Sequence, residues 1–243
     1  MKRCKPLISL LLCAALLLTA GGADASFKSY FDVDSTEPKI AITVDDCYRL
    51  NHLESILDLC QTYGIHMTFF PVGAAIVEEN AALWQRIVDE GHEIGNHTYS
   101  HPNITTLTAY QLERQLTRTQ DALNAVLRAP YPLRLFRPPY GKYNRTIYGN
   151  MEALEKLDYH YVIVWSVDHT DADDAFNETK NGSILLFHTN QKDVDCLTEL
   201  IPRLLEAGFE PVTVSELLGI DAAESGGTDK DYEVTGDGDA EGA

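Results

Sequence analysis

The stretch that decides the fold is IAITVDD, residues 40–46, an apolar run of five residues that ends in two aspartates. A short, uninterrupted apolar run is typical of a strand that is buried on both faces of a parallel sheet. Further short apolar runs follow, separated by longer segments, and this alternation predicts βαβ units. We predict strands at 40–44, 67–71, 93–96, 133–136, 161–165, 184–187 and 211–214.

Between the predicted strands, the sequence has the periodicity of amphipathic helices. In the clearest case Leu112 and Leu116 fall on one apolar face, and Thr108 with Gln111 forms a capping box at the start. Glycines close several of these segments, as is common at helix ends. We predict helices at 53–63, 75–90, 108–127, 145–157 and 193–207.

Seven strands that alternate with helices predict a single α/β domain folded as a barrel or near-barrel. We place this domain at residues 38–219, after a linker at residues 26–37. Residues 220–243 are rich in Gly, Asp and Glu and almost lack large apolar side chains. Such a segment cannot offset the entropy lost on folding, so we expect a disordered acidic tail. A solvated tail without a function is favoured over a docking segment.

The first 25 residues have the organisation of a signal peptide. Basic residues at positions 2, 3 and 5 precede an apolar run at 6–20, and an Ala-Asp-Ala cleavage site follows at 23–25. A retained membrane anchor is the alternative, although the run is short for a bilayer span. We expect a secreted or cell-envelope protein without stable membrane insertion after the signal is removed.

Charge and cysteine content narrow the classes of partner. The chain has a formal net charge of −18, and loss of the basic signal segment makes the charge more negative. Nucleic acid and anionic membranes would be repelled, so we expect a neutral substrate.

After the signal segment three cysteines remain, Cys47, Cys60 and Cys196. Because three is an odd number, the sequence predicts no disulfide framework.

Reactive side chains gather where the predicted strands end. In α/β barrels the carboxyl ends of the strands form the face that carries the active site. Chance scattering would not select this face after five different strands. The clusters are Asp45 and Asp46 after the first strand, His97 and His101 after the third, Arg137 after the fourth, Asp168 and Asp171 after the fifth, and His188 after the sixth.

The spacing of His97 and His101 is typical of metal ligands. Residues four apart on a helical turn point their rings to the same side. The alternative is a pair of surface or capping histidines. Asp46 supplies a third ligand, and two imidazoles with one carboxylate leave the open position that a hydrolytic metal centre requires.

The adjacent acids Asp45 and Asp46 have two interpretations. One is a helix cap or turn. The other is a buried pair at the mouth of the sheet, where the carboxylates repel unless cations compensate them. A metal on Asp46 and Arg137 beside Asp45 would do so. His188, at the end of an apolar run, is a fourth ligand, a core histidine or a general acid.

Five segments in order resemble the motifs of a known family. The chain resembles the polysaccharide deacetylases of the NodB-homology domain, carbohydrate esterase family four, over roughly residues 38–218. RPPYG and HTYSH match their motifs, whereas TVDDC resembles the usual TFDDG. The five segments are TVDDC at 43–47, HTYSH at 97–101, RPPYG at 137–141, WSVDHTD at 165–171 and LFH at 186–188.

The resemblance implies a distorted (β/α)7 barrel of a single domain and one divalent metal ion. The metal in the family is commonly zinc and sometimes cobalt or nickel, and its ligands here would be Asp46, His97 and His101. Asp45 would be the catalytic base that takes a proton from the attacking water. Arg137 would orient Asp45.

The resemblance also assigns roles around the substrate. The backbone N–H of Tyr140 would stabilise the oxyanion, so this residue would both bind substrate and contribute to catalysis. Leu186 would face the acetyl methyl group. His188 would protonate the leaving amine, and Asp171 would hold His188 and raise its pKa.

Two departures from the family pattern affect the expected site. Cys47 replaces the usual Gly, which adds a side chain at the mouth of the site and a thiol able to bind the metal. Ala172 stands where the family has Trp, so one wall of the acetyl pocket is smaller or is built from another segment. Val44 in place of Phe is a mild change.

The resemblance implies a secreted hydrolase that removes N-acetyl groups from a cell-wall or other N-acetylglucosamine-containing polysaccharide, either peptidoglycan or a chitin-like glycan. One alternative is an O-acetyl esterase acting on acetylated xylan. Hydrolysis of a small amide or imide is another. A third is a non-catalytic relative that binds glycan.

Overall fold

The computed structural model describes residues 28–142 and 153–220. The predicted signal peptide, most of the predicted helix at 145–157 and the predicted tail beyond Ile220 lie outside these residues. Within the described ranges, no helix is both long and apolar enough to cross a membrane.

Each of the seven predicted strands forms, generally with shorter bounds. The eighth strand, β1, was not predicted, because its residues fall in the segment that we expected to be a linker. Residues 28–30 are therefore part of the folded domain. The strands are β1 Lys28–Tyr30, β2 Lys39–Asp46, β3 Thr68–Pro71, β4 Glu93–Ile94, β5 Leu135–Phe136, β6 Tyr161–Ile163, β7 Ile184–His188 and β8 Glu210–Val212.

The strands form two parallel sheets. One sheet has the order β1-β6-β5, and the other has the order β4-β3-β2-β7, with β8 paired to β2. Single parallel bridges, Asn96 with Phe136 and Val167 with Leu185, link the two sheets at both seams. The predicted α/β class is confirmed. Where the two sheets meet, pairing is reduced to these single bridges, so the expected barrel is not continuous. At one of the two seams the strands β4 and β5 have only two residues each.

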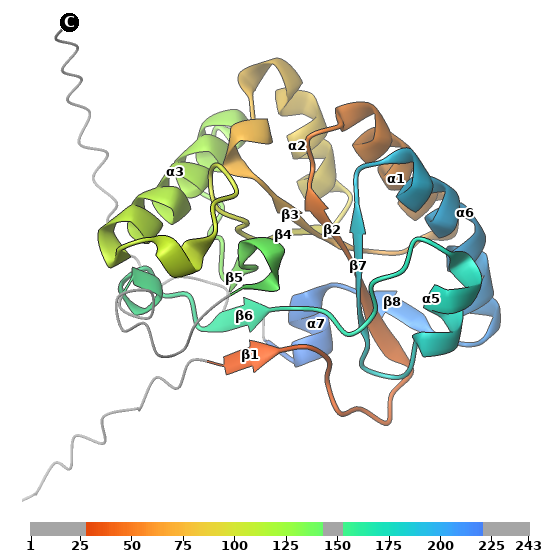
Figure 1. Cartoon of the computed structure of the whole chain (residues 1–243). Coiled ribbons are helices and arrows are strands. Elements are labelled where there is room, and N and C mark those ends of the chain that lie inside the picture. The colour runs from red at the N-terminus through yellow and green to blue at the C-terminus, as the bar shows by residue number, and fades with distance from the viewer. Residues whose placement is uncertain (1–27, 143–152, 221–243) are drawn as a thin grey trace, which may run out of the picture.

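Helices follow one another around the outside of the strands (Figure 1). Contacts between α1 and α6, α2 and α3, and α5 and α6 form this outer layer. The capping box of Thr108 and Gln111 is present at the start of α3. The helices are α1 Leu50–Tyr63, α2 Ala81–Asp89, α3 Ala109–Leu127, α5 Ala172–Glu178, α6 Gln191–Glu206 and α7 Val214–Leu218.

The prediction of one helix at 75–90 is only half right. Its first part forms two 3-10 turns, Gly73–Ala75 and Glu78–Asn80, and α2 begins only at Ala81. The N–H groups of Gly73 and Ala74 donate to the carbonyls of Thr98 and Tyr99. These bonds tie this segment to the loop that carries the two predicted histidine ligands.

The register of β2 places the reactive residues together. Asp45 is the partner of His188 on β7 and of Phe70 on β3. Residues 40–44, which directly precede Asp45 on β2, are apolar except for Thr43 and fully buried, so the strand runs through the core. The carboxyl ends of β2 and β7 therefore bring Asp45, Asp46 and His188 to one face of the domain, as the sequence predicted.

Candidate functional site

Asp46, His97 and His101 form a cluster of three donor groups. One atom from each residue lies within 4.8 Å of the others. The Nε2 atoms of His97 and His101 are 3.7 and 3.5 Å from the same oxygen, Oδ1 of Asp46. This oxygen is buried and has no hydrogen-bond partner among the described residues. A carboxylate oxygen in that state needs a cation, so the three residues fit a divalent metal with nitrogen and oxygen ligands.

The protonation of His97 also fits a ligand role. Its Nδ1 lies 2.7 Å from the carbonyl oxygen of Arg137, which can only accept a hydrogen bond. Nδ1 therefore carries the proton, and Nε2 presents its lone pair toward Asp46. Burial lowers the pKa of His97, which favours the neutral, ligating form.

The loop at 97–101 is not a helical turn, so the prediction of how the two rings converge is wrong. Thr98 and His101 both have positive φ, at 67° and 56°. Oε1 of Gln115 on α3 accepts hydrogen bonds from the N–H groups of Tyr99 and Ser100 at 3.0 and 2.9 Å. Both bonds go to this one side-chain oxygen, which holds the segment between the two histidines. The ring centroids of His97 and His101 are 4.9 Å apart.

A buried ion pair lies beside the donor cluster of Asp46, His97 and His101. Nη1 of Arg137 donates to Oδ1 of Asp45 at 2.7 Å, and both side chains are almost completely buried. The other oxygen, Oδ2, lies 3.6 Å from Nε2 of His97. One oxygen of Asp45 is thus fixed by Arg137, and the second faces the donor cluster. The predicted contact between Arg137 and Asp45 is present.

The side chain of Arg137 makes three further hydrogen bonds. Nη1 also donates to the hydroxyl of Thr43, while Nε and Nη2 donate to the carbonyls of Ile163 and Val164. Its guanidinium lies 4.2 Å from the ring centroid of Phe70. These contacts come from β2, β3 and the end of β6, so Arg137 joins three strands beneath the site.

His188 has a different carboxylate partner from the one that we predicted. Nδ1 of His188 lies 3.6 Å from Oδ2 of Asp193, on the first turn of α6. Asp171 instead caps α5, where its Oδ1 accepts hydrogen bonds from the N–H groups of Asp173 and Asp174. The expectation that Asp171 holds His188 is therefore wrong. The ladder between β2 and β7 places His188 beside Asp45, not among the three clustered donors.

Tyr140 and Leu186 flank the site from two sides. Tyr140 is 59% exposed, has a φ of 61° and places its ring 4.5 Å from that of His101. Leu186 is buried on β7, opposite Thr43 of β2. Tyr48, which the sequence analysis missed, is 53% exposed and follows the two aspartates closely. Its position directly after Asp45, Asp46 and Cys47 is the sequence signal that could have identified it as a residue of the site. An exposed aromatic ring next to a catalytic cluster offers a flat surface for contact with a substrate.

Cys47 lies in the core and not at the mouth of the site. Its side chain is fully buried, and its Sγ approaches the carbonyl of Val44 at 4.0 Å. Burial raises the pKa of its thiol well above the ordinary value, with the charges of Asp45 and Asp46 adding to this effect. The raised pKa favours the protonated thiol in the metal-free chain, and Cys47 is not one of the three clustered donors. Asp46 and Cys47 have positive φ, a conformation that explains why glycine suits position 47.

Ala172, at the position of the missing Trp, is buried as the first residue of α5. Trp165 lies nearby in the sequence and contacts the site from the end of β6. Its indole is 5.8 Å from the guanidinium of Arg137, and a Cβ at Gly141 would come within 2.9 Å of the same ring. Trp165 therefore packs between the Arg137 pair and the Tyr140 turn.

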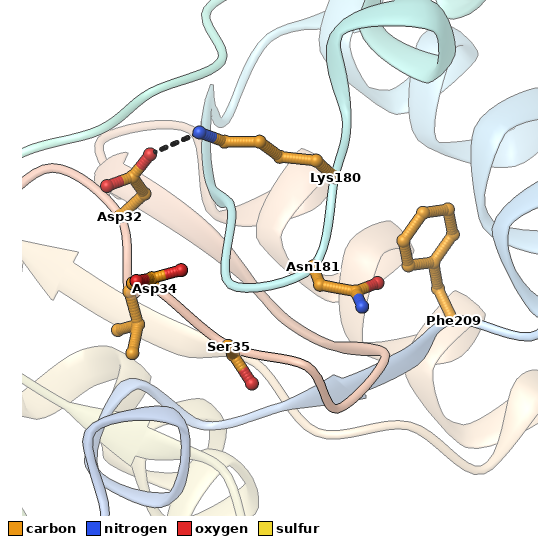
Figure 2. Close-up of a pocket in the computed structure, with 7 residues that line it drawn as sticks. Asp32, Asp34, Ser35, Lys180, Asn181 and Phe209 are labelled. Atoms are coloured by element: carbon orange, nitrogen blue, oxygen red, sulfur yellow. Dashed lines mark ion pairs between the residues drawn. The ribbon is translucent and has the colours of Figure 1, made fainter.

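A pocket of about 540 Å³ lies at the opposite, amino-terminal end of the strands. Figure 2 shows the Asp32–Lys180 ion pair across it, with an N–O distance of 2.8 Å. Asn181 and Phe209 line its other side. None of the predicted site residues lies in this pocket, and the donor cluster at the carboxyl ends of the strands remains the candidate site.

A family model described as polysaccharide deacetylase matches residues 32–162. The peptidoglycan-N-acetylmuramic acid deacetylase PdaC of Bacillus subtilis is 33% identical over 195 residues, covering 76% of this chain and 40% of that protein. A peptidoglycan-N-acetylglucosamine deacetylase of Bacillus cereus is 33% identical over 193 residues, covering 74% and 68%. A bifunctional xylanase/deacetylase of Pseudobutyrivibrio xylanivorans is 30% identical over 221 residues, covering 88% and 36%. The chain thus spans less than half of the first and third of these proteins.

Solved structures share the fold. The crystal structure of the Bc1960 peptidoglycan N-acetylglucosamine deacetylase matches with a TM-score of 0.69 and 31% identity, over 78% of this chain and 92% of that chain. A CE4 family pseudoenzyme from Bacillus anthracis matches with a TM-score of 0.69 and 25% identity, over 79% and 69%. The same fold thus occurs in a deacetylase and in a pseudoenzyme.

Proposed function

Because the chain belongs to the polysaccharide deacetylase family, we propose that it is a secreted, metal-dependent enzyme that removes N-acetyl groups from a glycan containing N-acetylglucosamine. The observation that carries the proposal is the donor cluster Asp46, His97 and His101 beside the buried Asp45–Arg137 pair. The signal-like residues 1–25 support secretion.

Asp46, His97 and His101 would hold the metal, for which we propose zinc. A bound divalent metal would polarise the attacking water and the acetyl carbonyl. The chain itself keeps the ligands oriented, because the carbonyl of Arg137 accepts a hydrogen bond from Nδ1–H of His97 and Gln115 holds the loop that carries His101.

Asp45 would accept the proton of the water that attacks the acetyl carbon. Its Oδ1 is held by Arg137, and its Oδ2 faces His97 of the donor cluster. A base in a fixed orientation needs no rearrangement when the proton moves. Arg137 therefore acts as a positioning residue for Asp45.

His188 would supply the proton to the nitrogen as the carbon–nitrogen bond breaks, which releases acetate and the sugar amine. With Nδ1 directed at Asp193, the other ring nitrogen is left for the substrate. The positive φ of Tyr140 turns the chain sharply after Pro139, a geometry suited to presenting its backbone N–H to the oxyanion. Leu186 would contact the acetyl methyl group.

For the substrate we propose peptidoglycan, because two relatives that are each 33% identical to this chain are named for that glycan. The decisive measurement is acetate release by the purified zinc-treated chain from peptidoglycan, N-acetylglucosamine oligomers and acetylated xylan. Release from the first two, abolished by a chelator and restored by zinc, is the expected result. No release from any of the three glycans would refute the proposed activity.

Two alternatives have specific support. The bifunctional xylanase/deacetylase relative favours O-acetyl esterase activity, which would appear as faster release from acetylated xylan than from N-acetylated sugars. The pseudoenzyme match favours a glycan-binding protein without turnover. That alternative would appear as retention on insoluble peptidoglycan with no acetate released.

Replacing Asp46 with Ala is expected to weaken zinc binding by more than about tenfold, since it removes the oxygen that both histidines face. Isothermal titration with zinc measures this affinity directly. His188→Ala is the matched control, because His188 lies outside the three clustered donors, and it should keep zinc. Equal zinc affinity in Asp46→Ala and the wild type would contradict the assigned ligand set.

A further inference from the structure

We propose that Asp193, and not Asp171, is the positioning residue that orients His188 and retains its proton for transfer to the leaving amine. The inference rests on the proposed role of His188 as proton donor. It adds to the site a residue that lies outside all five sequence segments from which the site was predicted.

Asp193 is held rigidly at the start of α6. Its Oδ2 accepts a hydrogen bond from the backbone N–H of His188 at 2.6 Å and another from Nδ2 of Asn190 at 2.9 Å. Asn190 in turn caps the helix by accepting from the N–H of Asp193. The carboxylate is only 1% exposed, so two donors and the surrounding protein fix its position beside the ring of His188.

The second oxygen of Asp193 points to the same conclusion. Oδ1 is buried and has no hydrogen-bond partner among the described residues. A buried carboxylate with an unsatisfied oxygen is costly unless a positive charge lies next to it. Among the described residues, Nδ1 of His188 is the ion-pair partner of this carboxylate and can carry that charge, although its contact of 3.6 Å is to Oδ2 and not to Oδ1. Protonation of His188 would therefore stabilise Asp193, and Asp193 would in turn favour the protonated ring.

Asp171 cannot take this role in the same conformation. Its Oδ1 accepts two backbone N–H groups at 3.0 and 3.1 Å at the start of α5. These bonds engage the carboxylate as the N-cap of α5. Among the described residues, the ion pair of His188 is with Asp193.

The other charges that face His188 act in the same direction. Asp45 and Asp46 act on it from β2 and Asp193 from α6, and all three favour the charged ring when no metal is bound. A cation held by Asp46 would offset the effect of that residue, whereas Asp193 lies outside the donor cluster. The pKa of His188 is raised, with Asp193 as the largest cause, although burial opposes the shift. His188 then keeps its proton to a higher pH than an ordinary histidine and loses it as the pH rises through this raised value.

The test compares Asp193→Asn, which keeps the shape and removes the charge, with Asp171→Asn, which keeps an equally good helix cap. The pH titration of the His188 ring is followed by NMR in zinc-treated protein, with His188→Gln to identify its signal. Asp193→Asn should lower the pKa of His188, and Asp171→Asn should leave it where it is. If Asp193→Asn does not fold, Asp193→Ser replaces it in the same titration.

Kinetics give the second readout. The alkaline fall in kcat should begin at a lower pH in Asp193→Asn, with KM unchanged, and the loss at alkaline pH should stay below the roughly 10²-fold or larger loss expected of His188→Ala. An unchanged His188 pKa in Asp193→Asn would overturn the proposal. Because the titration needs no turnover, it decides the question even if the wild type releases no acetate, a result that would count against the proposed function instead.

Discussion

Asp45→Asn is expected to lower the rate of acetate release by about two to four orders of magnitude while zinc stays bound. Positioned acid–base groups typically contribute a factor of this size. The substitution removes the oxygen that would accept the proton of water, but it leaves Asp46, His97 and His101 in place. The amide can still accept the hydrogen bond from Arg137, so the shape of the site is retained.

Acetate release and bound zinc are to be measured on the same preparation of Asp45→Asn. The thermal midpoint serves as the control, because the buried Arg137 loses its counter-charge in this variant and the fold is expected to be less stable. Rates are therefore compared well below the midpoint. A variant with nearly wild-type activity would remove Asp45 from the role of base, and one that has lost zinc would make Asp45 a ligand.

Arg137→Met should reduce the free energy of unfolding by about 3–5 kcal/mol, the usual cost of leaving one member of a buried ion pair without its partner. Asp45 would remain buried without its counter-charge, and Thr43 would lose the donor to its hydroxyl oxygen. Urea unfolding followed by circular dichroism gives this free energy.

The double variant Arg137→Met with Asp45→Asn separates the charge effect from the loss of packing. With neither charge present, the double variant should lose less stability than the sum of the two single losses, because the unpaired charge is the main penalty. Strictly additive losses would mean that the pair is not coupled and that Arg137 acts through its contacts with Ile163, Val164 and Phe70 alone.

The sequence predicts the strands and the donor cluster well for a physical reason. Runs such as residues 40–44 must be buried on both faces, and charged residues that follow them can only lie at the open end of the sheet. This constraint brings Asp46, His97 and His101 together without any knowledge of the loops between them. The pattern of apolar runs followed by charged residues therefore identifies the face of the domain on which the candidate site lies.

Loop geometry and pairings between elements lie beyond the reach of that reasoning. The turn at 97–101 depends on Gln115, a helix residue whose role has no local signature. Strand β1 forms because β6 has a free edge, not because residues 28–30 are strongly apolar. The pairing of His188 with Asp193 depends on where α6 begins, whereas the sequence motif directs attention to Asp171.

The side-chain amide of Gln115 couples metal binding to the packing of α3. Both N–H groups that donate to its oxygen belong to the segment between the two histidine ligands. These two hydrogen bonds therefore form only when α3 is packed in place. Metal binding and docking of α3 are then thermodynamically linked, and each stabilises the other. Where metal is plentiful, every tenfold rise in its free concentration above the dissociation constant would add about 1.4 kcal/mol to the stability of the closed form.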